Sequence, residues 1–232
     1  MFNDIAVVMG PKDEKLYIVM VGLPSQGKST VAFRLQDVFR RNAIPTRIFN
    51  NGVLRRKYAP HMDTWSSQFY NPENEQAVEL RKKFALINIR NARRYLNSKG
   101  QVAILDATNV SRDRRELIEE YLDDHPILYI QCVNNDEEIV ELSIRYKVKS
   151  PEFAVVQEND AIGEFKKRIE YYRMIYDDLD RERNYLRMNS LHNKIIEEQL
   201  IDQLPLYSRI RDCLVTDVVK GLFLVRHTET FY

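Results

Sequence analysis

Residues 22–29 have the spacing of a loop that holds phosphate groups. Gly22-Leu-Pro-Ser-Gln-Gly27-Lys28-Ser29 matches Gly-x-x-x-x-Gly-Lys-Ser without a gap. Glycines let the backbone approach phosphates closely, and a helix that follows offers free N–H groups to the anion. In such loops the lysine reaches the β- and γ-phosphates and the hydroxyl binds Mg²⁺. We therefore predict that ATP and Mg²⁺ are bound, and that the nucleotide site comprises Gly22, Leu23, Pro24, Ser25, Gln26, Gly27, Lys28, Ser29 and Thr30.

The alternative is a glycine turn in which the lysine occurs by chance. Residues 16–21 have the pattern of a buried strand and residues 31–41 that of an amphipathic helix, which is the setting the motif requires. The motif identifies a nucleotide and leaves the second substrate open.

Asp106 is the acid expected to work beside this loop. It ends Val102-Ala-Ile-Leu-Asp106, which has the pattern of a buried strand, and ligands bind at the carboxyl ends of strands in parallel sheets. Asp106 could join Ser29 in holding the metal, or accept the proton of an attacking hydroxyl. A helix cap or loop acid is the alternative. Thr108, just beyond, could donate hydrogen bonds to an oxygen-rich substrate.

The remaining pattern alternates short apolar runs with amphipathic stretches, which is typical of an α/β fold. We predict a P-loop NTPase-like, mainly parallel sheet with helices on both faces. The predicted strands are residues 16–21, 45–49, 102–106, 127–132 and 221–225. The predicted helices are residues 31–41, 75–98, 112–122, 136–146 and 159–179, with a helical stretch around 195–204.

Composition excludes several classes of protein. The chain has 232 residues, with 35 Lys+Arg against 34 Asp+Glu, so its net charge of +1 argues against a general nucleic-acid binder. We find neither an apolar run long enough to span a bilayer nor a signal peptide. Two cysteines cannot form a disulfide scaffold and indicate a reducing, cytoplasmic location.

Basic residues occur in clusters, for instance at Arg55-Arg56-Lys57 and Arg112-x-Arg114-Arg115. Most charge runs are solvated helix faces. A kinase whose acceptor already carries a phosphate nevertheless needs a second anion site, and arginine suits bidentate phosphate binding.

Taken together, these motifs resemble the kinase domain of the 6-phosphofructo-2-kinase/fructose-2,6-bisphosphatase family. The resemblance runs from about residue 16 to 230 and follows the order of the family. It rests on Ile18-Val-Met-Val-Gly-Leu-Pro-x-x-Gly-Lys28, on Pro45-Thr-Arg-x-Phe-Asn50-x-Gly52-x-x-Arg55-Arg56 and on Asp106-Ala-Thr-Asn109 with Arg112-x-Arg114-Arg115.

The resemblance implies transfer of a phosphoryl group from ATP to the 2-hydroxyl of fructose 6-phosphate. It implies catalytic positions at Lys28, Asp106, Cys132 and Lys147. It also implies that the sugar phosphate is bound by Arg55 or its neighbour Arg56, and by Arg81, Thr108, Arg114, Lys147, Arg168 and Tyr172. Cys132 has a second interpretation as a small core residue at the end of a strand, because phosphoryl transfer needs no thiol.

The C-terminal residues resemble the opening of a histidine phosphatase domain, with Arg226, His227 and Glu229 as its motif. We therefore expect a flexible leader at 1–14, a kinase domain at 15–220 and the truncated start of a phosphatase domain at 221–232. Bisphosphatase activity is not expected from this chain alone.

Two other functions stay open at this stage: another P-loop small-molecule kinase, and a catalytically degenerate regulatory domain that binds nucleotide. The expected partner is a small molecule, with no nucleic acid or membrane. The assembly is left open, with a homodimer as one option.

Overall fold

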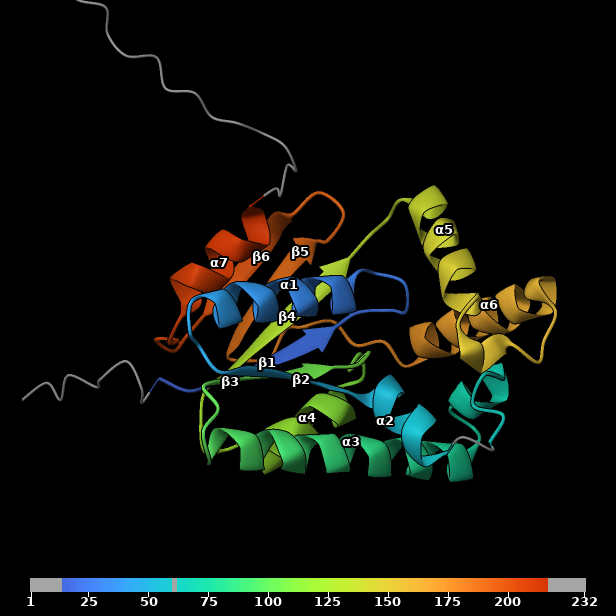
Figure 1. Cartoon of the computed structure of the whole chain (residues 1–232), viewed down its shortest axis with the longest axis horizontal. Coiled ribbons are helices and arrows are strands. Elements are labelled where there is room, and N and C mark those ends of the chain that lie inside the picture. The colour runs from blue at the N-terminus through green and yellow to red at the C-terminus, as the bar shows by residue number, and fades with distance from the viewer. Residues whose placement is uncertain (1–13, 60–61, 217–232) are drawn as a thin grey trace, which may run out of the picture.

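A six-stranded sheet forms the centre of the molecule (Figure 1). The computed structural model describes residues 14–59 and 62–216. The strand order is β2-β3-β1-β4-β5-β6, and all neighbouring pairs are parallel except β5 and β6. The strands are β1 (Leu16–Val21), β2 (Thr46–Asn50), β3 (Val102–Asp106), β4 (Ile127–Val133), β5 (Asn184–Asn189) and β6 (Lys194–Leu200).

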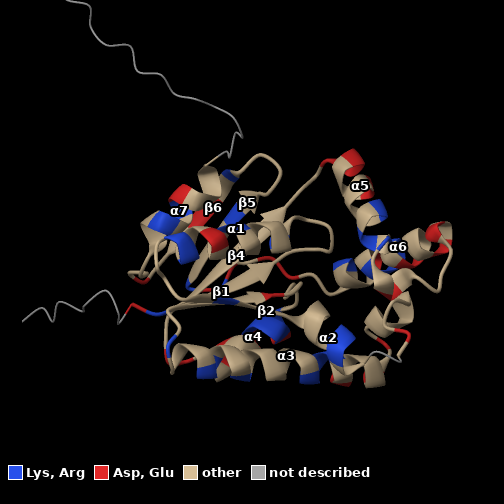
Figure 2. Cartoon of the chain, viewed as in Figure 1, with Lys and Arg blue, Asp and Glu red and all other residues tan. Residues whose placement is uncertain are grey.

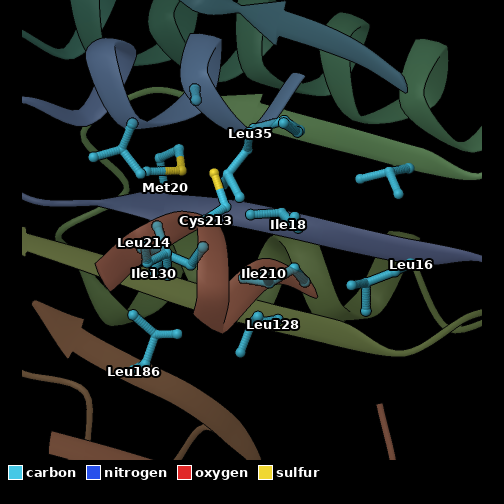
Figure 3. Packing of buried hydrophobic residues seen from close by; sticks show 14 of the residues in the cluster. Leu16, Ile18, Met20, Leu35, Leu128, Ile130, Leu186, Ile210, Cys213 and Leu214 are labelled. Carbon is cyan, nitrogen blue, oxygen red and sulfur yellow. The ribbon is translucent and has the colours of Figure 1, made fainter. Parts of the chain in front are cut away.

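Helices cover both faces of this sheet. On one face lie α1 (Lys28–Arg41) and α7 (Tyr207–Val215), and on the other lie α3 (Glu75–Leu96) and α4 (Arg112–Tyr121). Strands covered on both faces need apolar residues at successive positions, which explains the continuous apolar runs of β1, β3 and β4. In Figure 3, Leu35 of α1 and Ile210 of α7 pack against Ile18 of β1.

The remaining helices gather beyond the carboxyl ends of the parallel strands. Figure 1 shows α2 (Asn51–Tyr58), α5 (Glu137–Val148) and α6 (Glu158–Met174) at this end. Two short 3₁₀ helices, η1 (Ser67–Tyr70) and η2 (Pro151–Phe153), contribute to the same region. Lys and Arg residues occur on α2, α5 and α6 here (Figure 2). This end of the sheet therefore combines loop backbone with helices that carry basic residues.

The predicted fold class is confirmed, and so are strands 16–21 and 102–106. The helix predicted around residues 195–204 is wrong, because Lys194–Leu200 is strand β6. Its glutamates favour a helix, but antiparallel pairing with β5 overrides this weak propensity. Strand β5 and helices α2 and α7 were not predicted. The leader at 1–14, apart from Glu14, and the segment at 221–232 lie outside the described residues.

Among the described residues, no helix has both the length and the apolar character that a membrane span requires.

Arg115 of α4 joins segments that are far apart in the sequence. Its side chain is only 1% exposed and forms an ion pair with Glu182. Nη1 donates to the carbonyls of Val110 at 2.8 Å and Asp177 at 3.0 Å, and Nη2 donates to that of Asp178 at 3.1 Å. The loop after β3 is thereby attached to the segment that follows α6.

We predict that Arg115→Met lowers the free energy of unfolding by about 3–5 kcal/mol, because it leaves Glu182 buried without its cationic partner. Urea unfolding followed by circular dichroism would measure the loss. Arg183→Met is the matched control, since the pair that Arg183 forms with Asp202 is largely exposed and should contribute little to stability. Equal losses in the two variants would contradict this role.

Candidate active site

The phosphate loop connects β1 to α1, as its motif requires. Gly27 is the N-cap of α1 and has φ 75°, a left-handed conformation that glycine adopts without strain. Lys28 is 8% exposed, and its Nζ donates to the carbonyl of Leu23 at 2.6 Å across the loop. Ser25 is also buried, and its Oγ has no hydrogen-bond partner in the described structure. Thr30 lies further along α1 and is exposed.

Gly22 fits this loop against two neighbouring strands. It has φ 139°, and a Cβ atom at this position would lie 2.5 Å from the carbonyl oxygen of Cys132. Its N–H donates to the carbonyl of Thr108 at 3.0 Å. The phosphate loop is therefore packed directly against the loop that follows β3.

Asp106 faces the phosphate loop from the end of β3. It is 2% exposed, and its Oδ2 accepts hydrogen bonds from Ser29 Oγ at 2.7 Å and from Asn50 Nδ2 at 2.6 Å. Asn50 was quoted in the sequence motif but was not assigned a role, since only the register of β2 against β3 brings it beside Asp106.

Cys132 reaches the site through its backbone. The side chain is fully buried in the core between the sheet and α1. Burial raises the pKa of the Cys132 thiol to about 12 and outweighs the nearby charge of Lys28. The thiol is therefore neutral near pH 7. The atom of Cys132 that faces Gly22 is its backbone carbonyl oxygen.

A cavity of about 670 Å³ opens beside the loop that follows β3, and Ala107 and Thr108 line it, whereas Asp106 does not. Six of the eight residues predicted to bind the sugar phosphate line it, namely Arg55, Arg81, Thr108, Arg114, Arg168 and Tyr172. They come from α2, α3, α4, α6 and the loop after β3. Arg56 and Lys147 do not line this cavity.

Arg55 and Arg56 differ clearly in position. Arg55 is 5% exposed and forms an ion pair with Glu152 of η2, whereas the side chain of Arg56 is 48% exposed. Burial lowers the pKa of Arg55 to about 10, and the positive charge of Arg168 lowers it further. The geometry therefore favours Arg55 as the arginine that faces a ligand.

Two aromatic residues that the sequence analysis missed lie under the arginines. The Arg168 guanidinium is 3.9 Å from the ring centroid of Tyr70, and those of Arg55 and Arg81 are 5.6 Å and 5.9 Å from it. Phe69 has similar contacts with Arg55 and Arg81. Cation–π contacts of this kind stabilise arginines that repel one another. No sequence signal marked them, because η1 is a short turn without apolar periodicity.

Tyr172 lies at the centre of this positive charge. Burial raises its pKa, but Arg168, Arg81, a hydrogen bond with Thr108 and Arg114 together outweigh that effect and lower it. The Nε atoms of Arg55 and Arg168 are buried without hydrogen-bond partners in the described structure. Unpaired cationic donors around a cavity favour an anionic ligand.

The phosphate loop and the arginine cavity affect each other electrostatically. Burial lowers the pKa of Lys28 to about 8, while Asp106 opposes this shift and Arg168 adds to it. Surrounding protein atoms also lower the pKa of Lys147, and the charges of Lys28 and Arg168 lower it further. The Lys147 residue is itself exposed, so solvent screens these effects. The charges of Lys28 in the phosphate loop and of Arg168 in the arginine cavity thus both act on Lys147.

The residues present fit a nucleotide polyphosphate with a divalent cation. The glycine cradle, the unpartnered Ser25 hydroxyl and the Lys28 ammonium provide donors for phosphate oxygens. The hydroxyl of Ser29 and the carboxylate of Asp106 are hard oxygen ligands 2.7 Å apart, the kind that Mg²⁺ prefers. The predicted motif residues Arg226, His227 and Glu229 lie outside the described residues.

Comparison with known proteins establishes the family. The family profile described as 6-phosphofructo-2-kinase matches residues 4–221. The chain belongs to this family. It is 31% identical over 236 residues to the rat protein named 6-phosphofructo-2-kinase/fructose-2,6-bisphosphatase 3, covering 96% of this chain and 42% of the relative. It is 32% identical over 224 residues to the crab-eating macaque protein 6-phosphofructo-2-kinase/fructose-2,6-bisphosphatase 4, covering 92% of this chain and 47% of the relative.

The chain thus spans about half the length of these members of the family. Among solved structures, Kti12 of Chaetomium thermophilum in complex with ADP-AlF3 superposes with a TM-score of 0.53 at 16% identity. The match covers 85% of this chain and 95% of that structure, and it shows a shared fold.

We predict that Gly22→Ala disrupts the phosphate loop. The added Cβ would collide with the backbone carbonyl of Cys132, and the φ angle of residue 22 is strained for alanine. Thermal unfolding and titration with a fluorescent ATP analogue should show a lower melting temperature and loss of binding. Gly163→Ala in α6 is the matched control: a Cβ there has nothing within 4 Å, and alanine favours the helix by about 0.5–1 kcal/mol. ATP-analogue binding by the Gly22 variant equal to that of the Gly163 variant would contradict the close packing.

Proposed function

We propose that the chain is a 6-phosphofructo-2-kinase, which transfers the γ-phosphoryl group of ATP to the 2-hydroxyl of fructose 6-phosphate. The observation that carries this proposal is the second cationic site. Arg55, Arg81, Arg114 and Arg168 line one cavity. Thr108 also lines it, and its carbonyl accepts from the N–H of Gly22 in the phosphate loop. An acceptor that already bears a phosphate needs such a site, whereas a neutral acceptor does not.

The phosphate loop binds ATP in this proposal. The N–H groups at the start of α1 and the Lys28 ammonium compensate the charge of the β- and γ-phosphates. When bound, Mg²⁺ would be held by Ser29 and Asp106, and it would neutralise charge on the phosphate oxygens. Kinship with the family, whose profile matches residues 4–221, supports the same nucleotide and metal.

Asp106 also faces the acceptor. Its carboxylate is oriented by Ser29 and Asn50, so it can accept a proton from the attacking hydroxyl as the phosphoryl group is transferred. The arginines and Tyr172 hold the phosphate already on the sugar, and thereby orient the 2-hydroxyl. Lys147 lies between the two anions and offsets their mutual repulsion.

The setting of the reaction completes the proposal. A small phosphorylated sugar is the partner, and the composition supports a cytoplasmic location without nucleic-acid or membrane binding. We also propose that 221–232 opens a histidine phosphatase domain.

We predict that the protein converts fructose 6-phosphate to fructose 2,6-bisphosphate when incubated with ATP and Mg²⁺. The product is recognised by its acid lability and by release of fructose 6-phosphate on acid treatment. Lys28→Ala should lower kcat by about 10²–10³-fold, because it removes charge compensation at the phosphates. Asp106→Ala should lower kcat by about 10²–10⁴-fold while changing ATP affinity much less.

The controls separate the other functions. A panel of sugars, sugar phosphates and polynucleotide ends would reveal another small-molecule kinase, and tight ATP binding without turnover on any acceptor would indicate a regulatory domain. Well-folded, ATP-binding protein that makes no fructose 2,6-bisphosphate would reject the proposal.

We further predict that ATP binding at pH 8 is accompanied by proton uptake. The pKa of Lys28 is lowered to about 8 and that of Lys147 is also lowered, so part of each population is neutral at this pH. A bound polyphosphate stabilises both ammonium forms, and the linked uptake is at most about one proton for each lysine. Calorimetric titration in two buffers with different ionisation enthalpies measures this number.

Lys147→Gln should reduce the uptake, whereas Lys149→Gln, at the lysine two residues further along the chain, should leave it unchanged. The same uptake in wild type and in Lys147→Gln would show that Lys147 does not respond to the nucleotide.

A further inference from the structure

Asn50 occupies the point where strand β2 ends and helix α2 begins. In the parallel pairing of β2 with β3, Asn50 is directly opposite Asp106. Side chains at paired positions of parallel strands point to the same face of the sheet, so the amide lies beside the carboxylate. Its Nδ2 donates to Asp106 Oδ2 at 2.6 Å.

The other end of the same amide caps α2. Asn50 is the N-cap residue, and its Oδ1 accepts from the backbone N–H of Val53 at 2.9 Å. These two bonds determine the orientation of the amide, because only its oxygen can accept from an N–H and only its nitrogen can donate to a carboxylate. At Gly52, a Cβ would lie 3.2 Å from this oxygen, so glycine leaves room for the cap.

Helix α2 carries Arg55, which lines the cavity. The start of the helix is also attached to α3, since Asn88 Nδ2 donates to Asn51 Oδ1 at 2.7 Å. The orientation of Asp106 and the start of the Arg55 helix therefore depend on the same side chain.

We propose that Asn50 is a positioning residue for phosphoryl transfer: it holds Asp106 toward the phosphate loop while it fixes the helix that presents Arg55. This inference rests on the proposed kinase function. A cap alone would be served equally well by Asp or Ser, so the donor to Asp106 is what requires an amide here.

Asn50→Asp and Asn50→Ser test this role. Both side chains can cap α2, but the first places a second carboxylate beside Asp106 and the second is too short to replace the donor. We expect kcat for fructose 2,6-bisphosphate formation to fall by about 10–100-fold, as is usual when the partner that orients an active-site carboxylate is lost. KM for fructose 6-phosphate should change little, because the cap is kept.

Asn74→Asp is the matched control. Asn74 is the N-cap of α3 and accepts from Ala77 N–H at 3.1 Å, so the same substitution is made at a cap away from Asp106. The kcat of Asn74→Asp should stay within about twofold of wild type, a much smaller change than the one expected when the partner of Asp106 is replaced.

Two results would overturn the role of Asn50. One is a kcat within about twofold of wild type in both Asn50 variants, because losing the partner of a carboxylate should lower kcat by much more than that. The other is a fall in kcat that comes with an equal rise in KM for fructose 6-phosphate, which would indicate a merely structural cap.

If the wild type makes no fructose 2,6-bisphosphate, the proposed function fails, but ATP binding still tests whether Asn50 positions Asp106. Calorimetry with and without Mg²⁺ should give a ratio of affinities that both Asn50 variants change by at least about threefold and Asn74→Asp does not, because Asp106 is the metal ligand that Asn50 orients. An unchanged ratio in the Asn50 variants would overturn the role.

Discussion

The Asp106 carboxylate is the meeting point of the site. Ser29 of α1 and Asn50 of β2 both donate to its Oδ2, and Asp106 itself ends β3. Three chain segments far apart in the sequence thus converge on one oxygen atom that is almost completely buried. A buried carboxylate is stable only while its hydrogen bonds are kept. The parallel register of β2 and β3 and the start of α1 are therefore constrained together, and the phosphate loop and α2 follow from them.

The arginine cavity imposes the opposite constraint. Like charges at Arg55, Arg81 and Arg168 repel one another, and their pKa values are lowered mainly by burial. The ring of Tyr70 and the carboxylate of Glu152 compensate part of this cost. The two unpaired Nε atoms show that the compensation is incomplete. A bound anion would complete it, so this region gives up folding stability for affinity, as functional sites commonly do.

The parts of this arrangement that local pattern determines could be predicted from the sequence. The apolar runs of β1 and β3 and the glycine spacing of the phosphate loop each carry their own signal, so the strands, the loop and Asp106 were found. Pairing between distant residues carries no such signal. Strand β6 depends on β5, the contact of Asn50 with Asp106 depends on register, and the rings of η1 lie under arginines from other helices. Family resemblance supplied the arginines, but only the fold separates Arg55 from Arg56.

The hydrogen bonds of Asp106 and the arginine cavity are linked where the phosphate loop contacts the loop after β3. The N–H of Gly22 donates to the carbonyl of Thr108, so the phosphate loop cannot shift without moving a residue that lines the arginine cavity. Asn109, in a left-handed conformation, adds a second link by donating to the carbonyl of Met20 at 2.9 Å. Because backbone in this region is held at both ends, the sheet fixes the position of the phosphate loop relative to the residues that line the arginine cavity. In the proposed reaction catalysis consists mainly of positioning and charge compensation, and a sheet edge that holds these two groups of residues in place meets that requirement.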